Sequence, residues 1–133
     1  MSQENVELVR SGYRAFAEGN IETVLSLLDP DITLEEREPT LNTPSTYHGH
    51  QGLLDMVARV NEGLEDVKYA PERFVDVGDQ VLVEVRRKGR GSLSGVPVER
   101  WQFHIWDIAE GRLVGFRTYA DRQEALEAAG LRE

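Results

Sequence analysis

The chain has 133 residues, of which 40% are hydrophobic and 29% charged, and this composition is typical of one globular domain spanning residues 1–133. Its formal net charge is −9, and such an excess of carboxylates excludes general binding to nucleic acid and to anionic membrane surfaces. Cysteine is absent, which excludes disulfides, thiol catalysis and thiolate metal sites.

The first residues, MSQENVELV, contain neither the basic nor the apolar region of a signal peptide. No apolar run in the chain approaches the length of a membrane span. We therefore expect a cytoplasmic protein that does not contact a membrane.

Two amphipathic helices are predicted at the start of the chain. Apolar residues recur at helical spacing at Val6, Val9, Tyr13, Phe16 and Ala17. Ser2 can cap this first helix and Gly19 can end it, while Asn20 can cap a second helix that the DPD segment at 29–31 stops. The next segment, DITLEER, alternates strictly, so a strand is predicted in which Glu36 lies on the same face as Ile32 and Leu34.

Residues 38–50 are rich in Pro, Ser, Thr and Asn, and they are predicted to form a loop long enough to act as a lid. A third amphipathic helix follows, with apolar positions at Leu53, Val57, Val60 and Leu64. No internal repeat interrupts this order.

From Val67 the hydrophobic period changes to two, which predicts four strands in a meander. The turns are expected at Gly78, at 91–95 and at Gly111. Asp121 and Glu124 mark the start of a short last helix that Gly130 ends.

Helices and an antiparallel sheet that are segregated in this way indicate the α+β class. The strand from Val98 is apolar on both faces, so both faces of the sheet need cover. We expect Gln102, His104 and Trp106 to face a cavity beneath the helices, and the alternate row, Trp101, Phe103 and Ile105, to contact a second copy of the chain in a homodimer.

The chain resembles the SnoaL-like branch of the nuclear-transport-factor-2-like superfamily, because a set of degenerate motifs stands in that family's order. The segments are YRAFAEGNIETVLSLLDPDITLEER, YHGHQGLLDMV, VGDQVLVEVRRKGRG, HIWDIAEGRLVGFRTYAD and EALEAAG. The resemblance implies a cone-shaped α+β barrel, in which a curved, mostly antiparallel sheet wraps around the N-terminal helices and encloses a pocket, usually in a homodimer. The superfamily includes ketosteroid isomerase, scytalone dehydratase, limonene epoxide hydrolase, polyketide cyclases and noncatalytic members, so the fold alone does not fix the function.

The resemblance to ketosteroid isomerase implies that Glu36 is the general base and that His104 stabilises the oxyanion. Glu36 is identified by its separation along the chain from Gly19, and His104 by its separation from Gly111. Glu36 and His104 across one cavity are the acid/base pair that we predict. The structural alternatives are a solvated glutamate at a strand end and a core histidine bonded to the backbone or to Gln102. The chain departs from the family at two positions, since Tyr13 lies one place from the isomerase tyrosine and Thr118 replaces the cyclases' catalytic aspartate.

Aromatic and polar side chains are predicted to line the cavity and bind the substrate, although such a set can also be ordinary core. They are Tyr13, Phe16, Gln102, Trp106, Phe116 and Thr118. His48 and His50 could begin a metal site, but no third ligand has suitable spacing, so neither a metal nor a cofactor is expected. The basic run RRKGR at 86–90 is interpreted as a solvated edge or an ion-pair patch between subunits.

Three functions remain open on the sequence. The first is a cofactor-independent isomerase, dehydratase or cyclase that moves a proton on an apolar, carbonyl-bearing substrate. The second is a noncatalytic protein that binds a hydrophobic small molecule. The third is a dimeric interaction module whose cone is filled by side chains. A cavity that holds both Glu36 and His104 would favour the first over the others.

Overall fold

The computed structural model describes residues 2–37 and 45–131, and in these ranges it has four helices and one six-stranded sheet. The elements follow in the order α1 (Ser2–Ala17), α2 (Ile21–Leu27), β1 (Leu28–Glu36), β2 (Ser45–His48), α3 (Gly49–Gly63), β3 (Leu64–Asp76), β4 (Gln80–Gly91), β5 (Pro97–Ala109), β6 (Arg112–Tyr119) and α4 (Arg122–Ala128). The predicted α+β class is confirmed.

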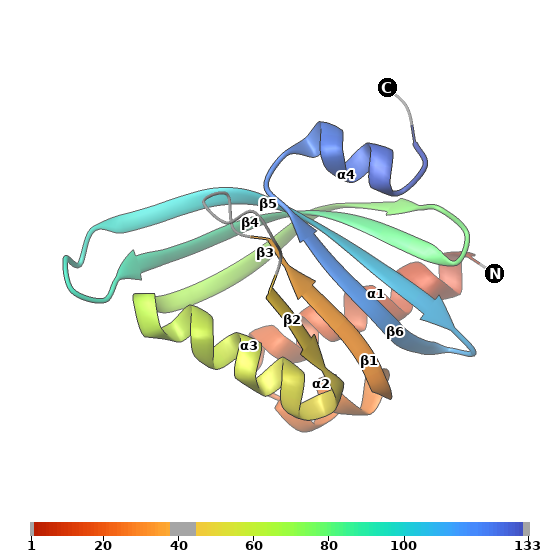
Figure 1. Cartoon of the computed structure of the whole chain (residues 1–133), viewed down its shortest axis with the longest axis horizontal. Coiled ribbons are helices and arrows are strands. Elements are labelled where there is room, and N and C mark those ends of the chain that lie inside the picture. Colours follow the sequence, from red (N-terminus) through yellow and green to blue (C-terminus); the bar gives the residue numbers. More distant parts are fainter. Residues whose placement is uncertain (1, 38–44, 132–133) are drawn as a thin grey trace.

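The sheet has the strand order β2-β1-β6-β5-β4-β3, and α1, α2 and α3 lie on one of its faces (Figure 1). Strands β3 to β6 form the predicted antiparallel meander. β1 joins it by parallel pairing with β6, in which Leu34 is opposite Phe116. The sheet is open at β2 and β3, so the cone is a curved sheet around the N-terminal helices that does not close into a full barrel.

The starts of α2 and α4 follow the predicted capping signals. Asn20 caps α2 by accepting a hydrogen bond from the backbone N–H of Thr23, and Gly19 has a φ of +75°, a conformation that glycine adopts without a Cβ penalty. Asp121 caps α4 in the same way, by accepting from the N–H of Gln123. Among the described residues, no helix is both long enough and apolar enough to cross a membrane. The cytoplasmic location stays a prediction.

Three predicted boundaries are wrong. The DPD segment does not stop α2, because β1 already begins at Leu28 and contains it. Residues 45–50, predicted as loop, form β2 and the start of α3, since β2 pairs antiparallel with β1. Leu64 belongs to β3 rather than to the third helix. The rest of the predicted lid, residues 38–44, lies outside the described residues.

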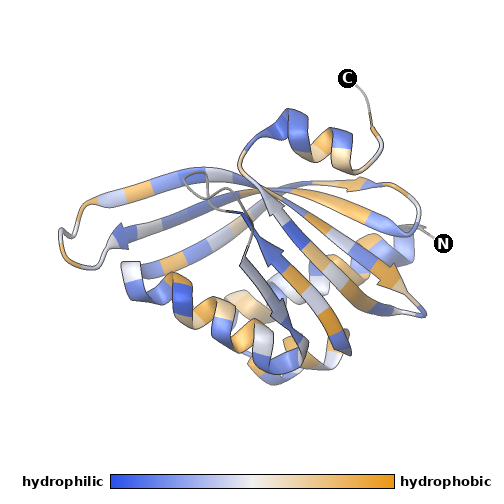
Figure 2. Cartoon of the chain, viewed as in Figure 1, coloured by the Kyte–Doolittle hydropathy of each residue, from blue (hydrophilic) through white to orange (hydrophobic). Residues whose placement is uncertain are grey.

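Each face of the sheet has its own core, as the alternation along the strands requires; Figure 2 shows this alternation as successive orange and blue bands. The larger core lies under α1, α2 and α3 and includes Ile32 and Leu34 of β1. On the opposite face, Phe103 and Ile105 pack with residues of α4 and are buried within the single chain. The expectation that a partner subunit covers these two side chains is wrong, because α4 already does so.

The packing of α3 on β2 gives a test of how tightly the cone is assembled. A Cβ at Gly52 would lie 3.0 Å from the carbonyl carbon and 3.1 Å from the Cβ of Tyr47, whereas a Cβ at Gly63 meets nothing within 4 Å. Although alanine favours a helix, we expect Gly52→Ala to lower the free energy of unfolding by about 1–2 kcal/mol because of this overpacking. The matched change Gly63→Ala should raise it by up to about 1 kcal/mol. Urea unfolding measures both, and a Gly52→Ala variant as stable as the wild type would contradict the close packing.

Candidate functional site

A cavity lies between the concave face of the sheet and the helices, and it encloses about 730 Å³ of atom-free space when its open mouth is included. Apolar side chains of α1, α3 and the strands form most of its walls. All eight predicted site residues line it: Tyr13, Phe16, Glu36, Gln102, His104, Trp106, Phe116 and Thr118. Their roles in binding or catalysis stay predictions.

Glu36 reaches the cavity because it continues the inward row of β1. Ile32 and Leu34 on the same row are fully buried, and Glu36 is only 7% exposed although it is the last residue of the strand. The alternative, that Glu36 is a solvated glutamate at the strand end, is therefore wrong, because its side chain is buried. A buried carboxylate at the edge of an apolar cavity is uncommon, because charged groups are rarely buried without a role or a partner.

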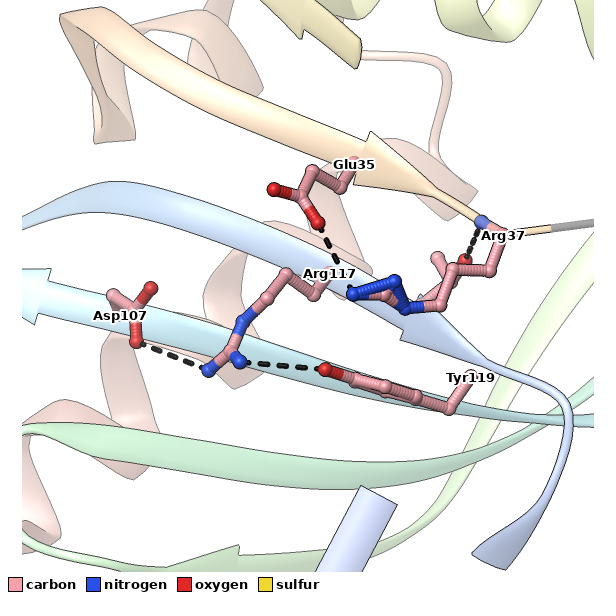
Figure 3. A network of polar contacts seen from close by, with 6 residues as sticks. Glu35, Arg37, Asp107, Arg117 and Tyr119 are labelled. Atoms are coloured by element: carbon pink, nitrogen blue, oxygen red, sulfur yellow. Dashed lines mark hydrogen bonds and ion pairs between the residues drawn. The ribbon is translucent and has the colours of Figure 1, made fainter. Parts of the chain in front are cut away.

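The two residues that flank Glu36 fix its strand from the other face of the sheet (Figure 3). The guanidinium of Arg37 donates to Glu35 at 3.3 Å and lies 4.7 Å from the ring centroid of Tyr119. The backbone N–H of Arg37 donates to the hydroxyl of Thr118 at 2.9 Å. These contacts tie the end of β1 to β6, so the backbone of Glu36 is held in place while its side chain faces the cavity.

His104 lies in the inward row of β5, between Gln102 and Trp106, as predicted. It is 4% exposed, and it is paired with Thr118 on β6 and with Val83 on β4. Its ring packs edge-on against Phe116, with ring centroids 5.0 Å apart.

Four side chains of the cavity form one chain of hydrogen bonds. The indole N–H of Trp106 donates to the Tyr13 hydroxyl at 2.9 Å, that hydroxyl lies 2.6 Å from Nδ1 of His104, and Nε2 of His104 lies 3.0 Å from Oε1 of Gln102. The indole can only donate, so the Tyr13 oxygen accepts there and its own O–H is directed to Nδ1. The arrangement therefore assigns to His104 the neutral tautomer with the proton on Nε2, which donates to Gln102.

Burial keeps both members of the Tyr13–His104 pair uncharged. Desolvation, and to a lesser degree the positive charge of Arg87, lowers the pKa of His104 to about 3. Desolvation likewise raises the pKa of Tyr13 well above its usual value, which the hydrogen bond from Trp106 only partly opposes. Near neutral pH, His104 is thus a hydrogen-bond donor rather than an acid or a base.

Removing the hydroxyl that joins Trp106 to His104 should be costly. We expect Tyr13→Phe to lower the free energy of unfolding by about 1–3 kcal/mol, because it leaves the part-buried indole N–H of Trp106 and Nδ1 of the buried His104 without this partner. Denaturant unfolding measures the loss. The control Tyr47→Phe removes a hydroxyl on the edge strand β2 and should cost less than about 0.5 kcal/mol. Equal losses of stability in the two variants would contradict this chain of hydrogen bonds.

A second, polar hollow adjoins the mouth of the cavity and shares Glu36, Gln102 and Thr118 with it. Its further walls include Arg87 and Arg100, which are opposite each other on β4 and β5. The sequence interpretation assigned Arg87 to a solvated edge or an ion-pair patch between subunits and did not consider Arg100. The sequence did contain a signal for both arginines. Arg87 is two residues after Val85 and Arg100 is two residues before Gln102, so each continues a row of side chains that faces inward.

The two histidines considered as a start of a metal site do not come together with other ligands. His50 is hydrogen-bonded to the backbone oxygen of Leu28 at 3.0 Å, and His48 lies on the edge strand β2 with its side chain exposed. Within residues 2–37 and 45–131, no three His, Asp or Glu side chains cluster closely enough to hold a metal ion.

Comparison with known proteins shows what this arrangement resembles. The sequence model of the SnoaL-like domain matches residues 9–116. An NTF2-like protein of unknown function from Burkholderia pseudomallei is 25% identical, with a TM-score of 0.78 over 93% of this chain and 95% of its own. TerC, co-crystallised with polyporic acid, is 26% identical, with a TM-score of 0.78 over 96% of this chain and 98% of its own.

A more distant structure shares the fold alone. A protein of ketosteroid isomerase-like fold from Catenulispora acidiphila, in complex with trimethylamine, is 18% identical, with a TM-score of 0.73 over 95% of this chain and 94% of its own. No protein of curated function matches the sequence.

Proposed function

The chain belongs to the SnoaL-like domain family, and from this premise we propose that its cavity binds an apolar, carbonyl-bearing small molecule and transfers a proton on it without a cofactor. The observation that carries the proposal is that Glu36 and the hydrogen-bonded His104 line one apolar cavity. A carboxylate can transfer the proton, and a neutral imidazole can stabilise an enolate by donating a hydrogen bond to its oxygen.

In the proposed reaction, Glu36 takes the proton from the carbon next to the substrate carbonyl. The C–H electron pair moves into the carbon framework, and negative charge develops on the carbonyl oxygen. In an isomerisation, Glu36 then returns the proton to another carbon. In a cyclisation, the enolate carbon attacks a second carbonyl, and Glu36 returns the proton to the alkoxide oxygen that this attack forms. Because Glu36 is only 7% exposed, few water molecules can reach it and compete for the proton.

His104 would stabilise the developing oxyanion as a neutral donor. Its Nε2–H is directed at Gln102, and the substrate oxygen would take the place of the Gln102 oxygen as the acceptor. The O–H of Tyr13 on Nδ1 fixes the tautomer that this requires. A neutral imidazole in such a place polarises a carbonyl without giving up its proton, which agrees with the lowered pKa of His104.

The second candidate is a noncatalytic binding protein for a hydrophobic small molecule. It is favoured by one observation, that both ring nitrogens of His104 already have protein partners. The co-crystallisation of TerC with polyporic acid supports a small-molecule ligand under both candidates.

Hydrogen exchange separates the two candidates. Apolar ketones and 1,3-diketones of one to three rings would be incubated with the protein in D₂O, while NMR follows both line broadening of the ligand and loss of its α-proton signal. Binding with exchange above the buffer rate supports proton transfer. Binding without exchange for every bound ketone contradicts catalysis and leaves the binding protein.

We also propose a homodimer through the face of the sheet that carries α4. Trp101 on this face is 42% exposed, with the Arg86 guanidinium 4.8 Å from its ring centroid, and α4 does not cover it. An exposed tryptophan is typical of interface centres. Sedimentation equilibrium tests the proposal, and a monomer at micromolar concentration would contradict it.

A further inference from the structure

The inward-facing rows of β4 and β5 change from uncharged to positively charged residues where they leave the cavity. On β4, Val81, Val83 and Val85 are fully buried on the helix side, and the next residue of that row is Arg87. On β5, the row of Trp106, His104 and Gln102 continues with Arg100, which is directly opposite Arg87. The apolar cavity thus adjoins a polar hollow that this pair of arginines lines.

These two arginines lie close together without a matching pair of carboxylates. Directly opposed like charges on neighbouring strands destabilise a sheet. In the ranges that the structure describes, neither Arg87 nor Arg100 makes an ion pair. Arg86, the neighbour of Arg87 that points to the other face, pairs by contrast with Glu99 at 3.3 Å and with Glu72 at 4.0 Å.

The hollow around the pair is positive in a chain of net charge −9. Glu36 is the one carboxylate among its described lining residues, against Arg37, Arg87 and Arg100. Arg37 is engaged with Glu35, so two arginines face one carboxylate at the mouth. Arg87 is directly opposite Tyr69 on β3, and Tyr69 lines the apolar cavity itself.

We infer that the ligand of this cavity is an organic anion, whose apolar body fills the cavity and whose carboxylate is held at the mouth by Arg87 and Arg100. A guanidinium recognises a carboxylate through two parallel N–H···O bonds, and two opposed guanidinium groups can share one anion. The anion would also offset the repulsion between the two arginines. This inference rests on the proposed function, since it needs a small molecule in the cavity, and it adds the charge class of that molecule.

Matched pairs of acid and neutral compounds test the inference. Calorimetric titration at low ionic strength would compare phenylacetate, 2-naphthylacetate and 4-biphenylacetate with their primary amides. We expect at least one carboxylate to bind roughly tenfold more tightly than its amide, and added NaCl to reduce this preference. The double variant Arg87→Met, Arg100→Met should lose the preference while it keeps the affinity for the amide.

The control is Arg86→Met, which removes one positive charge from the same strand but from the opposite face. It should keep the preference, and circular dichroism of all variants checks that they are folded. Equal binding of acids and amides by the wild type would overturn the inference and leave the pocket proposal standing. Loss of the preference in Arg86→Met would also overturn it, because the general field of the protein would then be the cause. Binding of none of the six compounds would contradict both proposals.

Discussion

Replacing Glu36 with glutamine is expected to lower kcat by roughly 10²–10⁴-fold, for any compound on which the wild type exchanges a proton, with little change in KM. Glutamine has the shape of glutamate and can fill the same buried place at the end of β1, but it cannot accept a proton from carbon. The loss should therefore appear in the chemical step rather than in binding. Exchange rates of the substrate proton in D₂O at saturating and limiting concentrations separate kcat from KM.

Two further variants make this result specific to the position of the carboxylate. Glu36→Asp keeps the charge but withdraws it by one methylene, so it should retain more activity than the glutamine variant and less than the wild type. Glu22→Gln removes an exposed carboxylate from the first turn of α2 and should leave kcat unchanged. A Glu36→Gln variant with more than about one third of the wild-type kcat would exclude Glu36 as the base.

The second large expected effect is the contribution that His104 makes to the pH dependence of the free energy of unfolding. Its pKa is about 3 in the folded protein, because of burial and the charge of Arg87, against about 6.5 in an unfolded chain. Between these values the unfolded state binds more protons, so the free energy of unfolding falls as the pH is lowered through this window. The contribution of His104 at pH 5 should be a loss of about 2 kcal/mol relative to pH 8.

The difference between wild type and His104→Gln isolates this effect from that of the carboxylates. Glutamine does not titrate, so the variant should lose less stability than the wild type between pH 8 and pH 5, whatever its stability at pH 8. Urea unfolding at each pH gives the two curves, and long-range ¹H–¹⁵N NMR of the wild type should show the neutral Nε2–H tautomer throughout. Parallel curves would mean that His104 is protonated in the folded state.

The sequence predicted the residues of the cavity better than their chemistry. Strict alternation in β1 and β5 was sufficient to place Glu36, Gln102 and His104 on the inward face, because the period of a strand leaves only two choices for each row. The neutral state of His104 could not be predicted in this way. It depends on Tyr13, which is 91 positions away in the chain, and on burial by elements that meet only in the folded protein.

The errors have a common physical origin in tertiary contacts. β2 is a four-residue strand in a segment with loop-like composition, and its pairing with β1 overrides that local preference. The run RRKGR gave the impression of one basic patch, although strand geometry sends Arg86 and Arg87 to opposite faces. The short helix α4 was predicted correctly, but its packing over Phe103 and Ile105 was not, because nothing local specifies which surface a terminal helix covers.

The parallel pairing of β1 with β6 has a consequence for when the cavity forms during synthesis. The hydrogen bond from Arg37 to Thr118 joins residues 81 positions apart, and it belongs to the contacts that hold Glu36 opposite the later strands. Contacts between residues so far apart in the chain form late in folding, because the long chain segment between them must first lose conformational entropy. A nascent chain can therefore form the β3–β4 and β4–β5 hairpins while it is still on the ribosome, but the cavity is complete only once β6 has emerged and paired with β1.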